Sequence, residues 1–297
     1  EEAVVSFDKA IQLIPDFAEA YYNRGNALKD LNQLAEAISS YVKAIQINPN
    51  YKEAFLGRGS ALKKLDRLDE ALENFDKALQ IRPGYVEALL NRGNTLKDLG
   101  QLQEAIESYD KAIQINPACM AAYYNRGNAF KESGQLQEAV TNYEKAIQIS
   151  PENIEAYSNL LMTLNYIVDQ NIDDQLAAAR KFGELVTRTI QKQLSAYQHQ
   201  PEPDRLRVGF VSGDLRNHPV GYFLESILSV IDSSKIEMIA YPTVPIVDAL
   251  SERIKPFFAD WKPICELNDE QAAAVIHADG IHLLIDLSGH TANNRLA

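Results

Sequence analysis

Cysteine is scarce in this sequence, and no apolar run is long enough to cross a membrane. The two cysteines, Cys119 and Cys265, lie far apart in the chain. We therefore expect no disulfide framework and a reducing compartment, the cytoplasm or the nucleus and cytoplasm of a eukaryote. A membrane-spanning helix needs about 20 predominantly apolar residues, and the sequence has no such run. The first residues, Glu1 to Val4, have the pattern of a helix interior, which leads us to expect further chain before residue 1.

Basic residues are not in excess either. The formal net charge is −12, and both the first 200 residues and the remainder carry more Asp and Glu than Lys and Arg. A protein that binds a phosphate backbone needs a basic stripe, so nucleic acid is not an expected partner. Cys and His do not have metal-ligand spacing, there is no Asp-x-Asp pair, and Gly209, Gly213 and Gly221 do not form the dinucleotide fingerprint. We therefore predict no metal site and no bound cofactor.

A repeat of 34 residues runs through the first half of the chain. Proline, alanine, an aromatic residue and glycine recur in register. They are Pro15, Pro49, Pro83, Pro117 and Pro151; Ala37, Ala71, Ala105 and Ala139; Tyr41, Phe75, Tyr109 and Tyr143; and Gly25, Gly59, Gly93 and Gly127. The pattern is that of the tetratricopeptide repeat. It departs from the usual leucine before the glycine, where this sequence has Arg24, Arg58, Arg92 and Arg126.

Each repeat unit is expected to form two antiparallel helices. Small residues let the helices approach closely, the aromatic residue fills the space between units, and the proline ends the second helix. The residues between the helices tolerate a left-handed backbone; they are Asn32, Asp66, Gly100 and Gly134. Because no unit can bury its apolar face alone, the units stack into an α-α superhelix, a tetratricopeptide solenoid. We assign residues 1–168 to the repeats, the last one divergent.

Asparagine recurs at two positions of the first helix in each unit, which is expected to line the concave surface. The first column is Asn23, Asn91, Asn125 and Asn159, interrupted by Gly57, and the second is Asn26, Asn94 and Asn128, interrupted by Ser60. Each asparagine offers a donor and an acceptor, as a peptide group requires. We therefore predict that the columns hold an extended polypeptide by its backbone. The alternative is that asparagine only tolerates a wet helix face.

Some tetratricopeptide domains hold a terminal carboxylate with lysines in the groove. The corresponding positions are Tyr22, Leu56, Leu90 and Tyr124, so we expect no such clamp. The superhelix can also dimerise through its convex face, and no pattern decides whether the protein is a homo-oligomer.

The sequence changes character after residue 168. We assign residues 169–204 to a connecting helix, over 173–193, and a polar linker with Pro201 and Pro203. Strands are then predicted over 206–212, 235–241, 261–265 and 281–287, alternating with helices over 220–231, 249–258 and 269–278. This alternation indicates a parallel sheet with helices on its faces.

Reactive side chains gather at the predicted strand ends, where parallel sheets bind ligands. His218 closes the segment from Ser212 that leads into a helix, and His282 enters the last strand, which exits toward His290. His218 is placed as a hydrogen-bond donor or a general base. For either histidine alone, a capping or core hydrogen bond is an equal alternative.

These segments resemble a known family. The runs Arg207–Asp214 and Arg216–Phe223, followed by Asp279–Thr291, are similar to the first blocks of the catalytic region in the O-GlcNAc transferase and SPINDLY family. The resemblance implies that residues 205–297 are the truncated N-terminal catalytic lobe, Rossmann-like, of a two-lobed glycosyltransferase. Such enzymes transfer a sugar from a nucleotide sugar to Ser or Thr hydroxyls of proteins without a metal, while the repeats bind the acceptor. His218 and His282 would then lie in the catalytic cleft.

The resemblance leaves the donor open between UDP-GlcNAc, which we favour, and GDP-fucose, which SPINDLY-type members use. Since the lobe that holds the nucleotide in relatives is not in the sequence, we expect these 297 residues to be inactive by themselves. The rival hypothesis is a tetratricopeptide interaction scaffold without catalysis.

Overall fold

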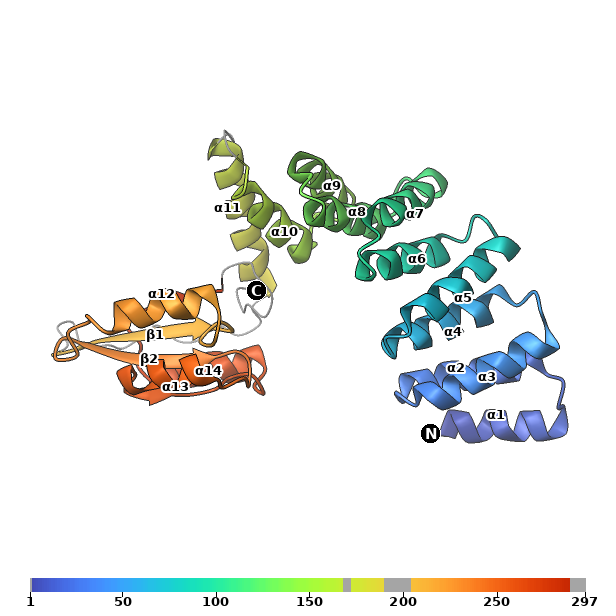
Figure 1. Ribbon diagram of the computed structural model, residues 1–297, viewed down its shortest axis with the longest axis horizontal. Coiled ribbons are helices and arrows are strands. Elements are labelled where there is room, and N and C mark those ends of the chain that lie inside the picture. The colour runs from blue at the N-terminus through green and yellow to red at the C-terminus, as the bar shows by residue number, and fades with distance from the viewer. Residues whose placement is uncertain (1, 168–171, 190–203, 289–297) are drawn as a thin grey trace. The chain divides into compact units, whose positions relative to one another are not determined.

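The computed structural model describes residues 2–167, 172–189 and 204–288 and has two compact units (Figure 1). Unit 1 spans Glu1–Gln170, and unit 2 spans Asn171–Ala297. In the described residues unit 1 consists of helices, whereas unit 2 combines helices with a sheet. Of the predicted linker over 195–204, only Asp204 lies within the described residues. Residue 168, the end of the helix predicted over 173–193 and His290 also lie outside them.

Unit 1 is a stack of helix pairs. Its helices are α1 (Glu2–Leu13), α2 (Ala18–Asp30), α3 (Leu34–Ile47), α4 (Lys52–Lys64), α5 (Leu68–Ile81), α6 (Val86–Asp98), α7 (Leu102–Ile115), α8 (Met120–Glu132), α9 (Leu136–Ile149) and α10 (Ile154–Leu164). Four complete units run from α2–α3 to α8–α9, α1 is the second helix of a preceding unit, and α10 is the first helix of the divergent one. The predicted solenoid is confirmed.

The turn inside each pair is left-handed, as predicted. Positive φ angles of 59°, 59°, 75° and 77° occur at Asn32, Asp66, Gly100 and Gly134 respectively. The residue after each of these donates its backbone N–H to a carbonyl in the last turn of the first helix; in the third unit, Gln101 N–H bonds to Leu96 O at 2.8 Å. This closing bond stops the first helix and reverses the chain.

Glycine and the aromatic residue form the contact that brings the two helices of a unit together. Tyr109 is fully buried, and its ring lies so close to Gly93 that a Cβ there would be 2.5 Å from ring atom Cε1. The same contact recurs for Gly25 with Tyr41, Gly59 with Phe75 and Gly127 with Tyr143. A side chain at this glycine would therefore force the ring, and with it the second helix, away.

First helices of neighbouring units touch one another directly: α2 contacts α4, α4 contacts α6, and α6 contacts α8. Contacts between consecutive second helices are sparse at most. First helices are therefore closer together than second helices, and the stack curves with the first helices on its inner side. We call the surface of α2, α4, α6, α8 and α10 that carries the seven column asparagines the asparagine face.

Unit 2 begins with α11 (Ile172–Thr189) and continues as an α/β lobe. Its elements are β1 (Leu206–Ser212), α12 (Pro219–Leu228), β2 (Ile236–Pro242), α13 (Ala249–Ile254) with a 3-10 turn (Lys255–Phe257), β3 (Asp260–Trp261), α14 (Asp269–Ala278) and β4 (Leu283–Asp286). The strands are parallel in the order β3-β2-β1-β4. The sheet is therefore wound in both directions from β1, as in a Rossmann-like lobe.

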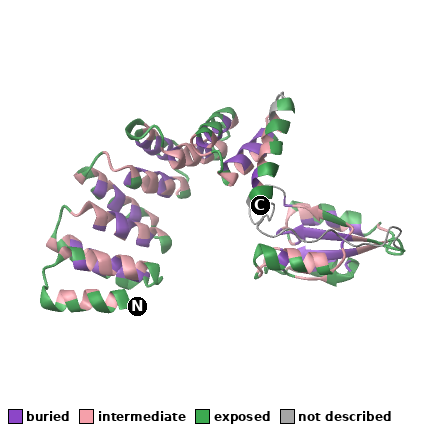
Figure 2. Ribbon diagram, turned by 180° about the vertical axis from the view of Figure 1, so that it is seen from behind, coloured by how far each residue is buried: buried purple, intermediate pink, exposed green. Residues whose placement is uncertain are grey.

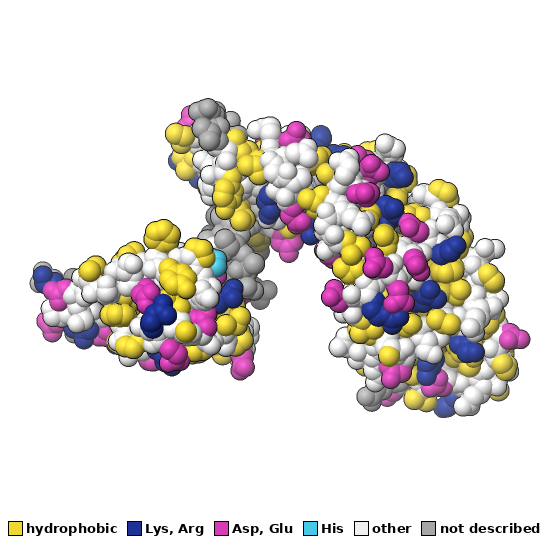
Figure 3. All heavy atoms as spheres, in the orientation of Figure 1, with side chains coloured by type: hydrophobic (Ala, Val, Ile, Leu, Met, Phe, Trp, Pro, Cys, Tyr) yellow, Lys and Arg dark blue, Asp and Glu magenta, His cyan; other side chains and the backbone are white. Residues whose placement is uncertain are grey.

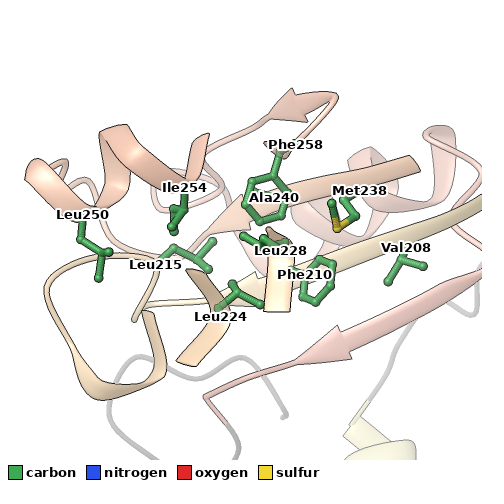
Figure 4. Close-up of a cluster of buried hydrophobic side chains, with 10 residues drawn as sticks. All are labelled: Val208, Phe210, Leu215, Leu224, Leu228, Met238, Ala240, Leu250, Ile254 and Phe258. Atoms are coloured by element: carbon green, nitrogen blue, oxygen red, sulfur yellow. The ribbon is translucent and has the colours of Figure 1, made fainter. Parts of the chain in front are cut away.

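Two apolar clusters cover the two faces of this sheet. On one face Phe210 of β1 and Ala240 of β2 pack with Leu224 of α12 and Ile254 of α13 (Figure 4). On the other face, side chains of the strands pack in a second cluster with Ala272 of α14. The last five residues of β1 and of β2 are accordingly buried, and in unit 1 buried residues lie between paired helices (Figure 2).

Several predicted boundaries in this lobe were wrong: the helix predicted over 220–231 ends at Leu228, and the strand predicted over 281–287 is Leu283–Asp286. Two others changed at a proline. The helix predicted over 249–258 ends at Ile254 and tightens into the 3-10 turn, because Pro256 has no N–H for the next α-helical bond. The strand predicted over 261–265 is only Asp260–Trp261, although beyond Pro263 the Ile264 N–H still donates to Pro242 O at 2.9 Å.

Apolar side chains also gather on the outside of α12, on the face shown in Figure 3. Phe223 and Ile227 of α12 are exposed by 76% and 53%, and Val230, just after the helix, by 80%, so the described residues leave this side of α12 uncovered. None of the described helices is long and apolar enough to cross a membrane.

Candidate functional site

The first asparagine column keeps hydrogen-bonding groups available on the asparagine face. Within the described part of the chain, the side chains of Asn23 and Asn125 make no hydrogen bond. The Asn91 amide nitrogen donates to its own helix, to Glu87 O at 2.9 Å, which leaves its oxygen available. All three side chains are half-buried, so a ligand that met them would be partly removed from water.

The second column serves the core, which the sequence did not reveal. The hydroxyls of Tyr41, Tyr109 and Tyr143 donate to the side-chain oxygens of Asn26, Asn94 and Asn128 at 2.7, 2.7 and 2.8 Å. Burial raises the pKa of all three tyrosines, so each phenol keeps its proton and remains a donor. The oxygens of Asn26, Asn94 and Asn128 are therefore each engaged by a core hydroxyl, and their amide N–H groups are the donors that they bring to the asparagine face.

The second unit shows why the columns are interrupted there. Its aromatic residue is Phe75, which has no hydroxyl, and the asparagine position holds Ser60, whose hydroxyl donates to Leu56 O at 2.9 Å. At Gly57 a Cβ would lie 2.7 Å from the ring of Tyr41. A unit with a core tyrosine therefore has asparagine in the second column, and the unit with a core phenylalanine has serine there. The residue in the second column depends on whether the core ring carries a hydroxyl.

Asn159 at the end of the first column belongs to a polar network between α8 and α10. Its amide nitrogen donates to Tyr124 Oη at 2.8 Å and to Asn128 Oδ1 at 3.4 Å, and its oxygen accepts from Lys131 Nζ at 3.1 Å. Asn159 is therefore held in place by neighbours, unlike Asn23 and Asn125. The structure thus separates seven asparagines that the pattern had treated alike.

The arginine before the glycine joins consecutive units at three of its four positions, Arg58 being the exception, and this role was not predicted from the sequence. Arg92 donates from Nε to Asp76 Oδ1 and from Nη1 to Ser108 Oγ, both at 2.7 Å. Arg24 and Arg126 bond in the same way to Asp8 with Ser40 and to Asp110 with Asn142. The recurrence of Asp8, Asp76 and Asp110 in step with the arginines was the available signal. These partners lie on the second helices, so the arginines point away from the asparagine face.

The carboxyl end of β1 opens into a loop, Gly213–His218, that is tied to neighbouring segments. Ser288, which follows β4, meets Ser212 Oγ at 3.4 Å and accepts from Gly213 N–H at 3.2 Å. The Asn217 N–H donates to Asp248 Oδ2 at 2.6 Å. The start of α12 lies tightly against this loop, since a Cβ at Gly221 would be 2.3 Å from Arg216 O. The loop is therefore held at the sheet end where ligands bind.

His218 is the N-cap of α12, and this fixes what its ring can do. Its Nδ1 accepts from Val220 N–H at 3.3 Å, while Asp214 Oδ2, at 3.7 Å, is too far for a hydrogen bond. In the neutral ring the hydrogen is then on Nε2. Nε2 has no partner among the described residues, and 39% of the side chain is exposed. As placed, His218 offers a hydrogen-bond donor to a ligand.

His282 lies at the other end of the sheet. Its ring Nδ1 accepts from the backbone N–H of Arg207 at 3.0 Å, and the backbone N–H of His282 donates to Arg207 O at 2.9 Å. Arg207 is near the start of β1, whereas His218 follows the end of that strand. A seven-residue strand is about 20 Å long, so the two histidines do not share one cleft. This geometry does not support the expectation that both lie in the catalytic cleft, and it gives His282 a part in strand pairing.

No group of three or more His, Cys, Asp or Glu side chains in the described ranges is placed to hold a metal ion. The hydroxyls of Ser212 and Ser288 are buried and bonded to each other and to backbone N–H groups of the loop. The Nε2–H of His218 is the hydrogen-bond donor that this loop offers to an oxygen-rich ligand.

Known proteins match both parts of the chain. Tetratricopeptide repeat families match residues 1–32, 18–51, 53–85, 74–107, 93–134 and 127–160, and the family described as glycosyl transferase family 41 matches residues 160–296. The probable UDP-N-acetylglucosamine–peptide N-acetylglucosaminyltransferase SPINDLY of Arabidopsis thaliana is 33% identical over 144 residues, which are 46% of this chain and 16% of that protein. The UDP-N-acetylglucosamine–peptide N-acetylglucosaminyltransferase of Caenorhabditis elegans is 36% identical over 97 residues, 31% of this chain and 8% of that protein.

A solved structure resembles this one over most of its length. A mutant of the Thermobaculum terrenum O-GlcNAc transferase superposes with a TM-score of 0.59 and 29% identity, covering 82% of this chain and 47% of that one. This chain thus spans less than half of each of these relatives. Tetratricopeptide repeats followed by a glycosyl transferase family 41 region place the chain in the O-GlcNAc transferase and SPINDLY family.

Proposed function

We propose that this chain is part of a protein O-glycosyltransferase that moves GlcNAc from UDP-GlcNAc to Ser or Thr hydroxyls. In this proposal the asparagine face binds the acceptor polypeptide and the β1–α12 loop takes part in transfer. The observation that carries it is the family 41 match over residues 160–296, which include a hydrogen-bonding loop at the carboxyl end of β1. The relatives named above support the donor by their own names.

The asparagine face suits a partner recognised by its backbone. Asn23 and Asn125 can each donate to a peptide carbonyl and accept from a peptide N–H, and Asn91 can accept. Asn26, Asn94 and Asn128 add N–H donors. Each such bond contributes about 0.5–1.5 kcal/mol net, so several together give useful affinity without reading the acceptor's side chains.

His218 contributes to transfer as a donor in this proposal. The acceptor oxygen forms a bond to the anomeric carbon while the bond from that carbon to the diphosphate oxygen breaks, and the diphosphate takes up the hydroxyl proton. The Nε2–H of His218 donates to a substrate oxygen on which negative charge develops, which lowers the barrier. Since Nε2 carries the hydrogen in this arrangement, the ring does not act as the base.

The test of catalysis uses the complete protein. Transfer to an acceptor protein is measured with UDP-GlcNAc and with GDP-fucose, and His218→Ala is expected to lower kcat for the preferred donor by about 10²-fold or more. Full activity of His218→Ala would remove it from the site, and a preference for GDP-fucose would correct the sugar. The 297-residue chain alone is expected to be inactive, because it spans 47% of the Thermobaculum chain.

The test of acceptor binding compares asparagines on and off the asparagine face. The triple change Asn23→Ala, Asn91→Ala and Asn125→Ala is expected to raise KM for a protein acceptor severalfold and to leave donor hydrolysis unchanged. Asn50→Ala is the matched control, since this exposed residue lies between α3 and α4. An unchanged KM in the triple variant would exclude the first column from acceptor binding.

A further inference from the structure

A row of lysines runs along the ends of the first helices, one in each unit. They are Lys29, Lys63, Lys97 and Lys131, at the 34-residue period. In the middle of the row each lysine meets an acid of the next unit: Lys63 Nζ lies 3.0 Å from Asp98 Oδ2, and Lys97 Nζ lies 3.1 Å from Glu132 Oε1. These ion pairs neutralise the central lysines and join neighbouring units.

At Lys131 this series of ion pairs stops. The acid would recur at residue 166, which is Tyr166 and lies past the end of α10. Among the residues that the structure describes, no carboxylate is within ion-pair distance of Lys131 Nζ. Its neighbour Glu132 is directed to Lys97 instead. Burial lowers the pKa of Lys131, and nearby Glu132 opposes that shift, as is typical of an ammonium that has lost water without gaining a carboxylate.

The surroundings of Lys131 place this charge on the asparagine face. Its Nζ donates one hydrogen bond, to Asn159 Oδ1 at 3.1 Å, and Asn159 in turn donates to Tyr124 Oη at 2.8 Å. An ammonium has three donors, so two remain for a ligand. The side chain is half-buried, which strengthens its attraction to an opposite charge relative to a fully solvated lysine.

The other end of the row shows that both features are required. Lys29 also lacks an ion pair in the described residues, since Lys64 occupies the position of the acid. The residue that corresponds to Asn159 is Gly57 there, so no asparagine holds the Lys29 ammonium on the face. Lys131 alone of the four combines a missing acid with an asparagine contact.

We propose that Lys131, held by Asn159, binds a carboxylate side chain of the polypeptide on the asparagine face. The bound chain supplies the acid that the repeat lacks at Lys131, so one of its Asp or Glu side chains takes the place that Asp98 and Glu132 fill for the preceding lysines. This rests on the proposed role of the asparagine face, and it adds a preference for acidic residues to a contact otherwise made with backbone.

The experiment uses two fluorescein-labelled peptides of Ser, Thr and Ala that differ only in a central Glu or Gln. Affinities for the full chain are measured by fluorescence anisotropy at low and high salt. We expect the Glu peptide to bind about fivefold tighter, the factor equivalent to ~1 kcal/mol for a partly exposed ion pair, and the preference to weaken with salt. Lys131→Gln is expected to abolish the preference, and Lys131→Arg to keep it.

Lys29→Gln is the matched control and should retain the preference. Equal binding of the two peptides to the unaltered chain overturns the inference and leaves the backbone contact standing. A preference that survives in Lys131→Gln overturns it as well. Binding of neither peptide removes both this site and the proposed role of the asparagine face. The peptide comparison on the unaltered chain needs no variant to fold.

Discussion

Replacing Asn94 with Ala is expected to destabilise the solenoid, because the substitution removes the hydrogen-bond acceptor of the Tyr109 hydroxyl. Tyr109 is fully buried, and its hydroxyl donates to Asn94 Oδ1 at 2.7 Å. Burial raises the pKa of Tyr109, so the hydroxyl stays protonated and needs an acceptor. Without the asparagine oxygen it loses its protein partner in the interior.

The expected cost follows from which groups lose their partners. Asn94→Ala leaves a buried donor unpaired, at about 1–3 kcal/mol, whereas Tyr109→Phe removes the donor and costs about 0.5–1.5 kcal/mol. The combined change Asn94→Ser with Tyr109→Phe reproduces the pair that the second unit already uses, Ser60 with Phe75. We expect this combination to be no less stable than Asn94→Ala alone.

The assay is urea unfolding of the full chain followed by far-UV circular dichroism, with a double-mutant cycle of Asn94→Ala and Tyr109→Phe. A coupling free energy of at least about 0.5 kcal/mol is expected for residues in contact. Asn91→Ala is the control, because this substitution leaves no buried group unpaired. Its effect on the free energy of unfolding should stay within about 0.5 kcal/mol. Additive effects within about 0.3 kcal/mol would refute the core role of the second column.

Three further outcomes are expected. Gly221→Ala should lower the free energy of unfolding of the α/β lobe in urea by at least about 1–3 kcal/mol, because the new Cβ would lie 2.3 Å from a backbone oxygen. Gly183→Ala, where nothing lies within 4 Å of the new Cβ, should instead stabilise α11 by about 0.5–1 kcal/mol. Equal effects of the two substitutions would contradict this expectation. Arg92→Gln should lower the free energy of unfolding in urea by about 1 kcal/mol more than Arg58→Gln, because only Arg92 makes hydrogen bonds of 2.7 Å to two neighbouring helices and the pair is partly exposed to water. Equal costs would show that the arginine column does not join the units. The pKa of Asp248 is lowered by backbone N–H groups of the β1–α12 loop and then of α13, so its stabilising effect is present above the ordinary carboxyl pKa and is lost as pH falls through the lowered one. Asp248→Asn should thus lower the melting temperature near pH 7 and have no effect in strong acid, and a pH-independent difference would contradict this.

The repeat architecture could be predicted from the sequence because it depends on local and periodic features. A left-handed turn residue, a helix-ending proline and a glycine opposite a ring act within one unit, and each recurs every 34 residues. The strands and helices of the α/β lobe were found for the same reason, since apolar runs and helical spacing are local. Only their ends moved, among them those at Pro256 and Pro263, where a missing N–H changes the hydrogen bonding.

The candidate sites could be predicted only in part, because hydrogen-bond partners come from different units or strands. Asn26, Asn94 and Asn128 looked equivalent to Asn91, yet their oxygens are used by buried tyrosines. His218 and His282 both stand beside strands, but parallel pairing sends them to opposite ends of the sheet.

The sequence by itself determined that there are stacked helix pairs, that asparagine recurs on their first helices, and that a parallel α/β lobe follows. Periodicity and composition are properties of the chain alone, so no three-dimensional information was needed. Only the tertiary structure decided which asparagines remain available to a polypeptide, which ring nitrogen of His218 carries hydrogen, and that Lys131 lacks the acid that Lys63 and Lys97 meet. Each of these depends on which atoms meet across the fold, and that is fixed by packing between elements distant in the chain.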